Sequence, residues 1–261
     1  MLLNPIYRSF VKRLIRDRFP PRSLGRPSKL DLDDGLDVLF KLIRTGMQWR
    51  EVQPVSVSPI TVYKHTRRWF EAGIFGDAYR RVLKVYAKHH PCKYYCMDST
   101  MVKNIHGQDC VGRNPVDRGR RGTKISTTTD HNGVTYSLIA TPANIPDVSL
   151  FQSVIEGHMV DIQRLEMFTD RGYNSRKNTS YCHRKGLKDR ISRRGSKTTR
   201  RSNSKRVVIE CSYSWIDKHR RLILRYEQDV NVYIEMTFLA MANMILKRFN
   251  VSEKELMPFC P

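Results

Sequence analysis

The chain has 261 residues, of which 47 are Lys or Arg and 25 are Asp or Glu, so its formal net charge is +22. This excess of positive charge favours a polyanionic partner, because each neutralised phosphate releases condensed counterions. With 40% hydrophobic residues, the chain should fold rather than remain disordered. No apolar run approaches the roughly 18–20 residues that span a bilayer, and the N-terminus lacks the layout of a signal peptide. We expect a soluble intracellular protein with no membrane partner.

The cysteine pattern gives no sign of a zinc site. No two of the six cysteines form a Cys-x-x-Cys pair, and no second pair completes a site with Cys92 and Cys96. Cys182 and His183 are adjacent, which is poor geometry for two ligands of one tetrahedral ion. Free thiols in a reducing compartment are the expectation, and no zinc is assigned.

Apolar residues at helical spacing predict that residues 1–90 form a helical domain. A first helix should have Asp31, Asp33 and Asp34 at its start, where they complement the helix dipole, and Gly46 near its end. A second should cover about 58–73, because Ser58 is a suitable cap and Pro59 suits a first helical turn. A third should follow over about 75–88.

The second of these helices carries a basic face. Lys64, Arg67 and Arg68 lie among aromatic residues, and a turn-rich segment at 53–59 precedes them. One interpretation is a helix-turn-helix whose second helix enters the major groove of DNA. The other is a plain helical bundle with a solvated basic face. The sequence leaves both open.

The pattern changes after Pro91 to one typical of a mixed α/β core. Residues 93–102 are rich in strand formers, and residues 123–141 predict a β-hairpin because Asn132-Gly133 is a strong turn signal. The later elements are expected as helices at about 148–156, 174–185, 206–218 and 229–249 and strands at about 165–169 and 187–191. We therefore divide the chain into a helical N-terminal domain (1–90), a catalytic domain (91–250) and a tail (251–261).

Three acidic residues fall at informative places in this core. Asp98 lies inside a predicted strand, Asp170 at the end of another, and Glu210 on a helix. Ligands of open α/β sheets gather near strand ends, so the three carboxylates could converge on one crevice and hold two divalent cations. In a structural interpretation, Asp98 and Asp170 serve turns and Glu210 pairs with Arg206 one helical turn earlier. Of the three, Asp98 is the hardest to explain structurally. It ends an apolar run, and burying a carboxylate is costly without a partner or a metal.

Four stretches of the chain resemble the DDE-type transposases of bacterial insertion sequences, most closely the insertion-sequence-5 group. Residues 46–50, 61–63 and 68–69 are similar to the family's N-terminal helical region. Met97-Asp98-Ser99-Thr100, with the later segment 118–124, resembles the first catalytic strand and the strand pair after it. Thr169-Asp170-Arg171-Gly172-Tyr173 resembles the second-Asp motif, and Arg206-Val-Val-Ile-Glu210, continuing to about Glu227, resembles the C-terminal signature.

The resemblance implies a ribonuclease-H-like fold: a mixed sheet with flanking helices, preceded by a helical N-terminal domain. It also implies that Asp98, Asp170 and Glu210 are the catalytic triad and hold Mg²⁺, with Mn²⁺ as the alternative ion. The sequence departs from the family at two positions. Asn174 stands where such motifs often have Asp, and Cys211 stands where a basic residue commonly follows the Glu. Neither change removes a metal ligand.

Two other acids are rivals for the site. Glu227 lies near Arg225 and is interpreted as half of a surface ion pair, and Asp109 is interpreted as a solvated turn residue. Tyr173 is expected to pack at the site.

Two basic segments flank the predicted acids. A dense run of Lys and Arg covers 176–206, with residues 192–205 expected to be a loop, and a second basic loop covers 112–121. Single-signed runs repel themselves without an anion, so we interpret both as surfaces for the DNA backbone. The candidate DNA-binding residues are Lys64, Arg67, Arg68, Arg120, Arg121, Arg193, Arg194, Arg200, Arg201 and Arg206.

The leading hypothesis is a DNA transposase that cleaves at the ends of its element and joins them to target DNA by metal-dependent phosphodiester transfer. Its partners would be double-stranded DNA and further copies of itself, as a homodimer or higher multimer. It would work in the cytoplasm at the nucleoid, or in the nucleus of a eukaryotic host. One alternative is a nuclease of the same fold that only hydrolyses DNA. The other is a DNA-binding protein that has kept the fold without catalysis.

Overall fold

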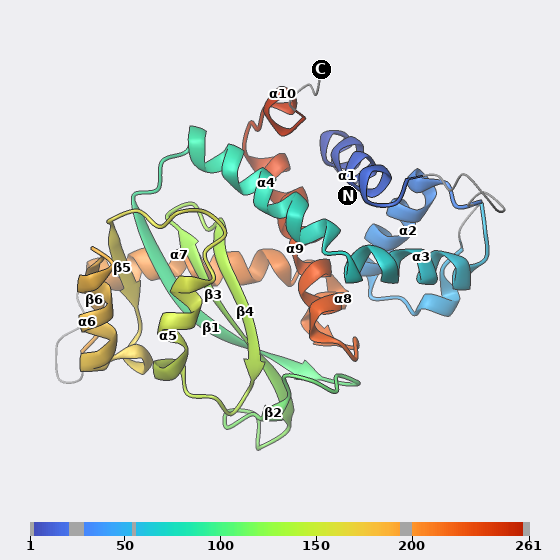
Figure 1. Ribbon diagram of the computed structural model, residues 1–261. Coiled ribbons are helices and arrows are strands. Elements are labelled where there is room, and N and C mark those ends of the chain that lie inside the picture. Colours follow the sequence, from blue (N-terminus) through green and yellow to red (C-terminus); the bar gives the residue numbers. More distant parts are fainter. Residues whose placement is uncertain (1–2, 21–28, 54–55, 194–199, 258–261) are drawn as a thin grey trace. The chain divides into compact units, whose positions relative to one another are not determined.

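The computed structural model describes residues 3–20, 29–53, 56–193 and 200–257; of residues 200–203 it describes the backbone only. The chain forms two compact units, drawn in Figure 1. The sheet unit comprises His89–Trp215 and Leu224–Gln228. The helical unit comprises Met1–Lys88, Ile216–Ile223 and Asp229–Pro261. Each unit therefore takes segments from distant parts of the sequence.

The sheet unit is built around one seven-stranded mixed sheet in the described part of the chain. Its central strand β1 pairs antiparallel with β3 and parallel with β5, so it is buried on both faces over residues 95–97. The order is β2-β3-β1-β5-β6, with β4 on β3 and β7 on β1. The strands are β1 (Tyr94–Asn104), β2 (Gly112–Arg113), β3 (Arg121–Asp130), β4 (Thr135–Pro142), β5 (Glu166–Thr169), β6 (Lys188–Ile191) and β7 (Leu224–Arg225).

Helices cover both faces of this sheet. Figure 1 shows α5 in front of the sheet and α7 behind it. Helix α7 is fixed to the sheet by Ile209, which packs with Cys96 of β1 and Phe168 of β5, and by Lys205 Nζ, which lies 4.5 Å from the ring centre of Phe168. The helical elements of this unit are α5 (Asp147–Glu156), the 3₁₀ turn η2 (Arg171–Tyr173), α6 (Arg176–Arg184) and α7 (Arg200–Ile216).

The helical unit gathers its elements around α9. Every residue of α9 from Glu235 to Ala242 is buried, so the helix is enclosed on all sides and forms the core of the unit. The elements are α1 (Pro5–Arg18), α2 (Leu32–Thr45), η1 (Trp49–Glu51), α3 (Pro59–Glu71), α4 (Ile74–His89), α8 (Arg220–Ile223), α9 (Val230–Arg248) and α10 (Glu253–Leu256). No helix among the described residues is long and apolar enough to cross a membrane.

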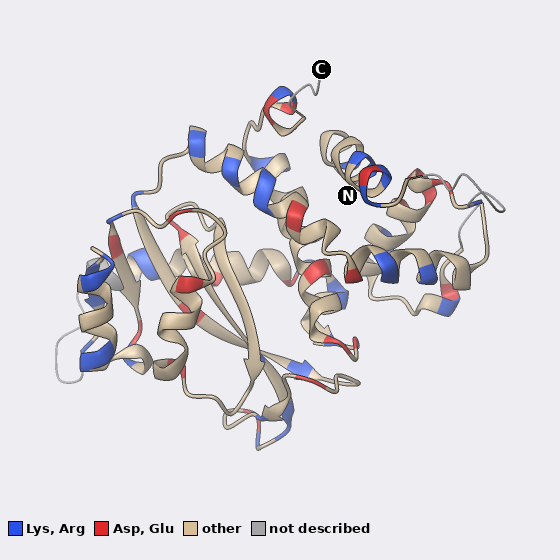
Figure 2. Ribbon diagram, in the orientation of Figure 1, with Lys and Arg blue, Asp and Glu red and all other residues tan. Residues whose placement is uncertain are grey.

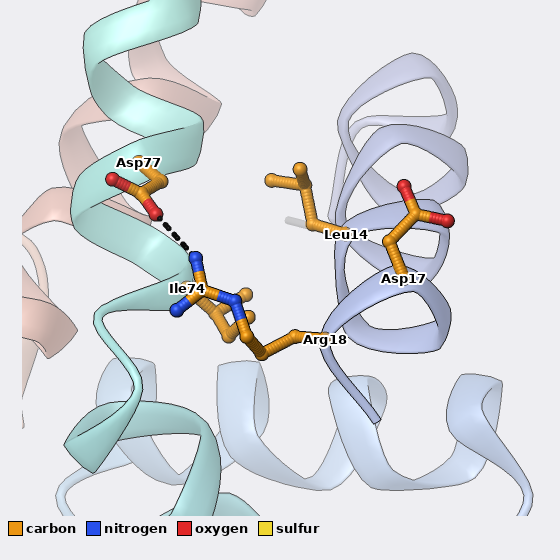
Figure 3. A pocket seen from close by; sticks show the side chains of 5 residues that line it. All are labelled: Leu14, Asp17, Arg18, Ile74 and Asp77. Carbon is orange, nitrogen blue, oxygen red and sulfur yellow. Dashed lines mark hydrogen bonds and ion pairs between the residues drawn. The ribbon is translucent and has the colours of Figure 1, made fainter. Parts of the chain in front are cut away.

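A small groove between α1 and α4 is visible in Figure 3. It has a volume of about 140 Å³ and is lined by Leu14, Asp17, Arg18, Ile74 and Asp77. Arg18 reaches across it to Asp77, with Nη2 and Oδ2 3.2 Å apart. Both charged side chains are about half exposed, so the groove is a solvated seam between two helices rather than a buried binding site.

The mixed α/β fold class with flanking helices, predicted from the sequence, is confirmed. The predicted helix ends are also found: Ser58 caps α3 by accepting from Thr61 N–H, and Gly46 ends α2 in the left-handed conformation that suits glycine.

The predicted loop over 192–205 is partly wrong, because α7 already begins at Arg200. The sequence was divided into continuous ranges, whereas the helical unit also takes in 229–261.

One buried carboxylate joins two helices of the helical unit. Glu235 of α9 is 8% exposed and accepts hydrogen bonds from the backbone N–H groups of Phe75 (2.8 Å) and Gly76 (3.1 Å) at the start of α4. Burial raises the pKa of Glu235 to about 7, although the two N–H donors lower it. The carboxyl group is therefore easier to protonate in the folded chain than in the unfolded one.

Glu235 should make the helical unit less stable as the pH rises. Because the folded pKa lies above the unfolded one, the stabilisation is complete below about pH 4.5 and is lost as the pH rises through about 7. We expect Glu235→Gln to remove this loss, so that the variant gains on the order of 2 kcal/mol over the wild type between pH 5 and pH 8. Denaturant unfolding across this range measures it. Exposed Glu51→Gln is the control, and parallel pH profiles for Glu235→Gln and wild type would contradict the prediction.

Candidate active site

Asp98 and Asp170 lie on neighbouring parallel strands at the same level of the sheet. The β1–β5 register pairs Met97 with Thr169, and each aspartate is the next residue in its chain. Paired strands are about 4.8 Å apart, and residues at one level project to the same face. The charge of Asp170 accordingly acts on Asp98. The two carboxylates therefore lie side by side where β5 ends, which is where ligand sites form in open α/β sheets.

The surroundings of Asp98 disfavour its negative charge. Its side chain is 25% exposed. Burial raises the pKa of the Asp98 carboxyl, and the charges of Asp170 and Asp147 raise it further. The backbone N–H of Ser99 (2.8 Å) and the guanidinium of Arg206 (3.6 Å) lower it without reversing the shift. A partly desolvated carboxylate among like charges is a setting that a bound cation would stabilise.

Helix α7 contacts Asp98 through two residues, one on either side of Glu210 in the sequence. Arg206 contacts the carboxylate of Asp98, and the Tyr213 hydroxyl donates a 2.7 Å hydrogen bond to the backbone oxygen of Asp98. Glu210 lies between them at helical spacings of four and three residues, so it shares their face of the helix. Its side chain is exposed, whereas the neighbouring Ile209 is buried against the sheet. Glu210 therefore lies on α7 between the two residues that contact Asp98, with its own side chain exposed.

The segment after β5 is folded back tightly. Asp170 caps η2 by accepting from the N–H of Gly172. Tyr173 is buried, and its hydroxyl lies 2.7 Å from Ser99 Oγ, which is in turn 2.7 Å from Ser126 Oγ. Burial raises the pKa of Tyr173 well above its usual value, so the phenol stays protonated. This chain of hydroxyls ties the residue after Asp98 to the turn that follows Asp170.

Two charged residues beside the site were not predicted from the sequence. Lys124 of β3 has a side chain only 4% exposed, and its Nζ lies 2.6 Å from Asp147 Oδ1 and 2.6 Å from the backbone oxygen of Ile145. Asp147 is the first residue of α5. An acid in the first turn of a helix is ordinarily explained by the helix dipole. No spacing rule links it to a lysine on a distant strand, so only the fold reveals the pair.

The interpretation of the rival acids was wrong for Glu227 and incomplete for Asp109. Arg225 is fully buried, and its guanidinium donates to Asp109 Oδ1, to the backbone oxygen of Asp109 (2.6 Å) and to that of Gln228 (2.8 Å). Asp109 is 45% exposed in a bend, as expected of a solvated turn residue, but it also anchors the buried guanidinium of Arg225. Glu227 is 7% exposed, so it does not form a surface pair. These groups hold β7 and the loop after β1 together.

The candidate DNA-binding residues of the helical unit lie on α3. Lys64 and Arg67 are exposed, and Arg67 Nε pairs with Glu71 at 2.9 Å. The guanidinium of Arg68 lies 4.8 Å from the ring centre of Phe19. Beside them, the exposed Tyr63 packs edge-on against Trp49. The helix therefore presents a mixed basic and aromatic surface, which fits either of the two interpretations left open by the sequence.

The remaining basic candidates belong to the sheet unit. Arg120 and Arg121 are exposed at the start of β3, and Arg193 is exposed after β6. Arg206 is directed to Asp98, so it lies at the acidic site rather than on an outer surface. Figure 2 shows further Lys and Arg on α6 and in the loop beside β2. Arg194 lies outside the described residues, as do the side chains of Arg200 and Arg201.

The oxygen donors present suit a hard divalent cation. Asp98 and Asp170 supply adjacent carboxylates, and the raised pKa of Asp98 reflects an electrostatic cost that such an ion would offset. As the side chains stand, no three His, Cys, Asp or Glu residues in the described ranges are close enough to hold one ion together. A cation at this site would therefore begin from the aspartate pair, and further ligands would have to move toward it.

The fold and the site together define a class of protein. The mixed sheet, with adjacent aspartates on β1 and β5 and covering helices on both faces, is consistent with a ribonuclease-H-like fold.

Comparison with known proteins agrees with this class. Residues 167–247 match the family described as "Transposase DDE domain". The chain is also 29% identical over 136 residues to a protein of Burkholderia cepacia named "Putative transposase for insertion sequence element IS402". That alignment covers 49% of this chain and 64% of the relative, so the chain spans just under two thirds of the relative's length.

The resemblance to DDE-type insertion-sequence transposases is confirmed, whereas the insertion-sequence-5 group stays a prediction. DDE transposases generally use divalent metal ions.

Removing the charge of Asp98 should stabilise the protein when no divalent ion is present. A carboxyl whose folded pKa is raised lowers stability once it is ionised, so Asp98→Asn should melt above the wild type at pH 7 in a chelator. Added Mg²⁺ should raise the melting temperature of the wild type, and so reduce the difference in melting temperature between the wild type and Asp98→Asn. Thermal unfolding with and without Mg²⁺ measures both effects, with exposed Asp161→Asn as the control. An Asp98→Asn variant that melts below the wild type in chelator would contradict this account.

Proposed function

We propose that this protein is a DNA transposase that cleaves at the ends of its element and joins the freed 3′-hydroxyl to target DNA. The observation that carries the proposal is the pair of aspartates on adjacent parallel strands, at the carboxyl end of β5, in a chain that matches a DDE transposase domain. Paired carboxylates in a basic protein suit metal-assisted phosphodiester chemistry. The net charge of +22 supports a DNA substrate.

In this proposal Asp98, Asp170 and Glu210 hold the catalytic Mg²⁺, or Mn²⁺ in its place. Bound divalent ions would activate the attacking water or 3′-hydroxyl and stabilise the leaving oxygen. The protein's own part is positioning: the β1–β5 register sets the separation of the two aspartates, and the Tyr213 bond to Asp98 fixes α7 on the sheet. Glu210 would approach from α7, where an exposed side chain can change rotamer.

Arg206 would balance charge at the acidic site. At 3.6 Å from Asp98 it is outside ordinary hydrogen-bond distance, and its buried Nε has no hydrogen-bond partner among the described residues. Such a guanidinium can favour ionised Asp98 and still donate a hydrogen bond to a phosphate oxygen. We assign it to the DNA strand being cut, in keeping with its place among the candidate DNA-binding residues.

The other basic residues would position the DNA. Arg120, Arg121 and Arg193 are exposed on the sheet unit, and contacts of this kind to phosphates fix register without reading sequence. Reading of the terminal repeats is assigned to α3, whose Lys64 and Arg67 are exposed. Two element ends require two sites, so the working form would be a homodimer or higher multimer on DNA, acting in the cytoplasm at the nucleoid.

Each of Asp98→Ala, Asp170→Ala and Glu210→Ala should abolish cleavage while leaving DNA binding intact. Loss of a group that stabilises transition-state charge costs on the order of 10²- to 10³-fold in rate or more. A fragment that carries the element's end, incubated with Mg²⁺ and a target plasmid, gives cleavage and strand-joining products on one gel. Asp161→Ala, an exposed aspartate of the same unit, is the control.

The products distinguish the competing functions. Cleavage and joining that both depend on the three acids support the transposase. Cleavage without joining would identify a nuclease of the same fold. Binding with neither product, in a wild-type protein that is folded, would identify a DNA-binding protein without catalysis. Near-normal cutting by any one variant would remove that residue from the site.

We expect α3 to determine the preference for end DNA over random DNA, and the sheet unit to supply the affinity for DNA of any sequence. Arg120→Ala with Arg121→Ala and Arg193→Ala should weaken binding to end and random DNA alike, and should lower the slope of log K against log salt by about 0.9 for each phosphate that is no longer neutralised. Lys64→Ala with Arg67→Ala should instead reduce the preference for end DNA. Binding titrations on both DNAs at several salt concentrations measure this.

Point variants are preferable to deletion of residues 1–90, because α9 buries its surface among the N-terminal helices and would be left exposed. If the Lys64 and Arg67 substitutions leave the preference for end DNA unchanged, α3 does not read the sequence. If the salt slope is unchanged by the three arginine substitutions, those residues form a solvated surface only.

A further inference from the structure

The loop between β2 and β3 presents an apolar side chain at a strongly basic tip. Val116 is 84% exposed, and Pro115 beside it is exposed as well. A single exposed valine is ordinary on a protein surface, so its surroundings decide what it means. Residues 112–121 hold four arginines against one aspartate, a formal charge of +3 (Figure 2). All four are exposed: Arg113, Arg118, Arg120 and Arg121.

These arginines repel one another in the absence of an anion. The pairing of β2 with β3 sets Arg113 directly opposite Arg121, and like charges opposite each other destabilise a strand pair. None of the four arginines forms an ion pair with an acid in the described part of the chain. The one acid of the loop, Asp117, lies 3.8 Å from Lys103 Nζ instead. The loop is therefore suited to a polyanion, whose phosphates would offset this repulsion.

The tip of the loop is held in shape by its own backbone. Asn114 is 6% exposed; its N–H donates to the backbone oxygen of Arg120 (2.8 Å), and its own backbone oxygen accepts from Gly119 N–H (2.9 Å). Its side-chain oxygen accepts from the N–H of Val116 (3.0 Å). Arg118 has a φ of +50°, which a bulky side chain rarely adopts and which the surrounding structure must impose. Val116 is thus presented on a preformed support.

An apolar tip between arginines fits the minor groove of DNA. Proteins that kink a duplex insert an apolar wedge between neighbouring base pairs from this groove, while basic residues hold the phosphates. The groove is about 6 Å wide, so a narrow loop enters it more easily than a helix does. A second copy of this chain is a poor occupant, because its net charge of +22 would repel the loop.

We propose that the loop tip at 115–118 inserts into the minor groove, with Val116 entering between neighbouring base pairs and the arginines holding the phosphates beside it. This inference rests on the proposed function, because DNA is the partner. It goes further by giving the sheet unit a role in deforming DNA, in addition to its contacts with phosphates.

The register of the sheet sets the distance from this loop to the aspartates. Arg121 precedes Thr127 by six residues on β3, and Thr127 pairs with Asp98. Six residues of strand span about 20 Å. At 3.4 Å per base pair this corresponds to about six base pairs. The deformed step should therefore lie about six base pairs from the phosphate that is cut.

Val116 and Arg118 should affect DNA in different ways. Val116→Ser should abolish bending and leave the salt dependence of binding unchanged, because a neutral side chain releases no counterions. Val116→Met should keep the bend, since it retains an apolar wedge. Arg118→Asn should also keep the bend, because Asn tolerates the left-handed conformation, and should lower the slope of log K against log salt by about 0.9. A loop that only contacts phosphates predicts no effect of Val116.

The first measurement is binding of the full chain to a random-sequence duplex of about 30 base pairs. Resonance energy transfer between dyes at the two ends measures the bend, which should be roughly 20–90° for the wild type. Val148→Ser, which removes a 37% exposed valine from α5, is the matched control and should bend DNA as the wild type does. Thermal unfolding checks that Val116→Ser is folded, as expected for so exposed a side chain.

The second measurement locates the deformed step. A fragment that carries the element's end is prepared with 2-aminopurine at successive positions, because its fluorescence rises when the base is unstacked. The signal with the wild type should be largest about six base pairs from the cleaved phosphate. Val116→Ser should lower it to the level of the unbound fragment.

Three outcomes separate the claims. A bend that is lost in Val116→Ser and kept in Arg118→Asn and Val148→Ser supports the assignment. A wild type that binds DNA without bending or unstacking it, or a Val116→Ser variant that bends DNA as the wild type does, overturns the assignment. Cleavage of end DNA that depends on Asp98 would still support the proposed function in that case. A wild type that neither binds nor cleaves DNA overturns the proposed function, and this inference with it.

Discussion

The parallel pairing of β1 with β5 is the constraint on which the rest of the site depends. It fixes Met97 opposite Thr169 and so sets Asp98 and Asp170 beside each other, at a separation governed by strand spacing rather than by flexible side chains. Two adjacent carboxylates repel, and one of them is partly desolvated. The fold tolerates this arrangement because basic groups surround it: Arg206 from α7 and, one step further out, Lys124 from β3. A divalent cation bound beside the two carboxylates would offset their repulsion.

Each layer around the sheet contributes to this constraint. On one face, Tyr213 and Ile209 fix α7 on the sheet, and Arg206 of this helix contacts Asp98. The other face is held by Lys124, together with the amide of Asn178, which locks the start of α5 against the turn after Asp170. The site is therefore rigid where its aspartates lie and adjustable where Glu210 is exposed.

Much of this could be predicted from the sequence, and the failures have physical causes. The helix caps at Ser58 and Gly46 and the Asn132-Gly133 turn are local signals, and all three act as expected. Asp98 and Asp170 were identified because local motifs surround them, and their strands pair as an α/β core requires. By contrast, Lys124 and Asp147 are 23 residues apart and meet only through tertiary packing. The burial of Arg225 and Glu227 was missed for the same reason, because Arg225 meets Asp109 from 116 residues away and no local pattern in the sequence indicates such a contact.

The most direct test of the central claim is a crystal structure of the full chain soaked with Mn²⁺, with the ion located by its anomalous scattering. The account predicts a peak bound by carboxylate oxygens of both Asp98 and Asp170, at the carboxyl end of β5. Ordered Mn²⁺ elsewhere on the protein, with that position empty at a concentration that saturates binding in solution, would contradict it.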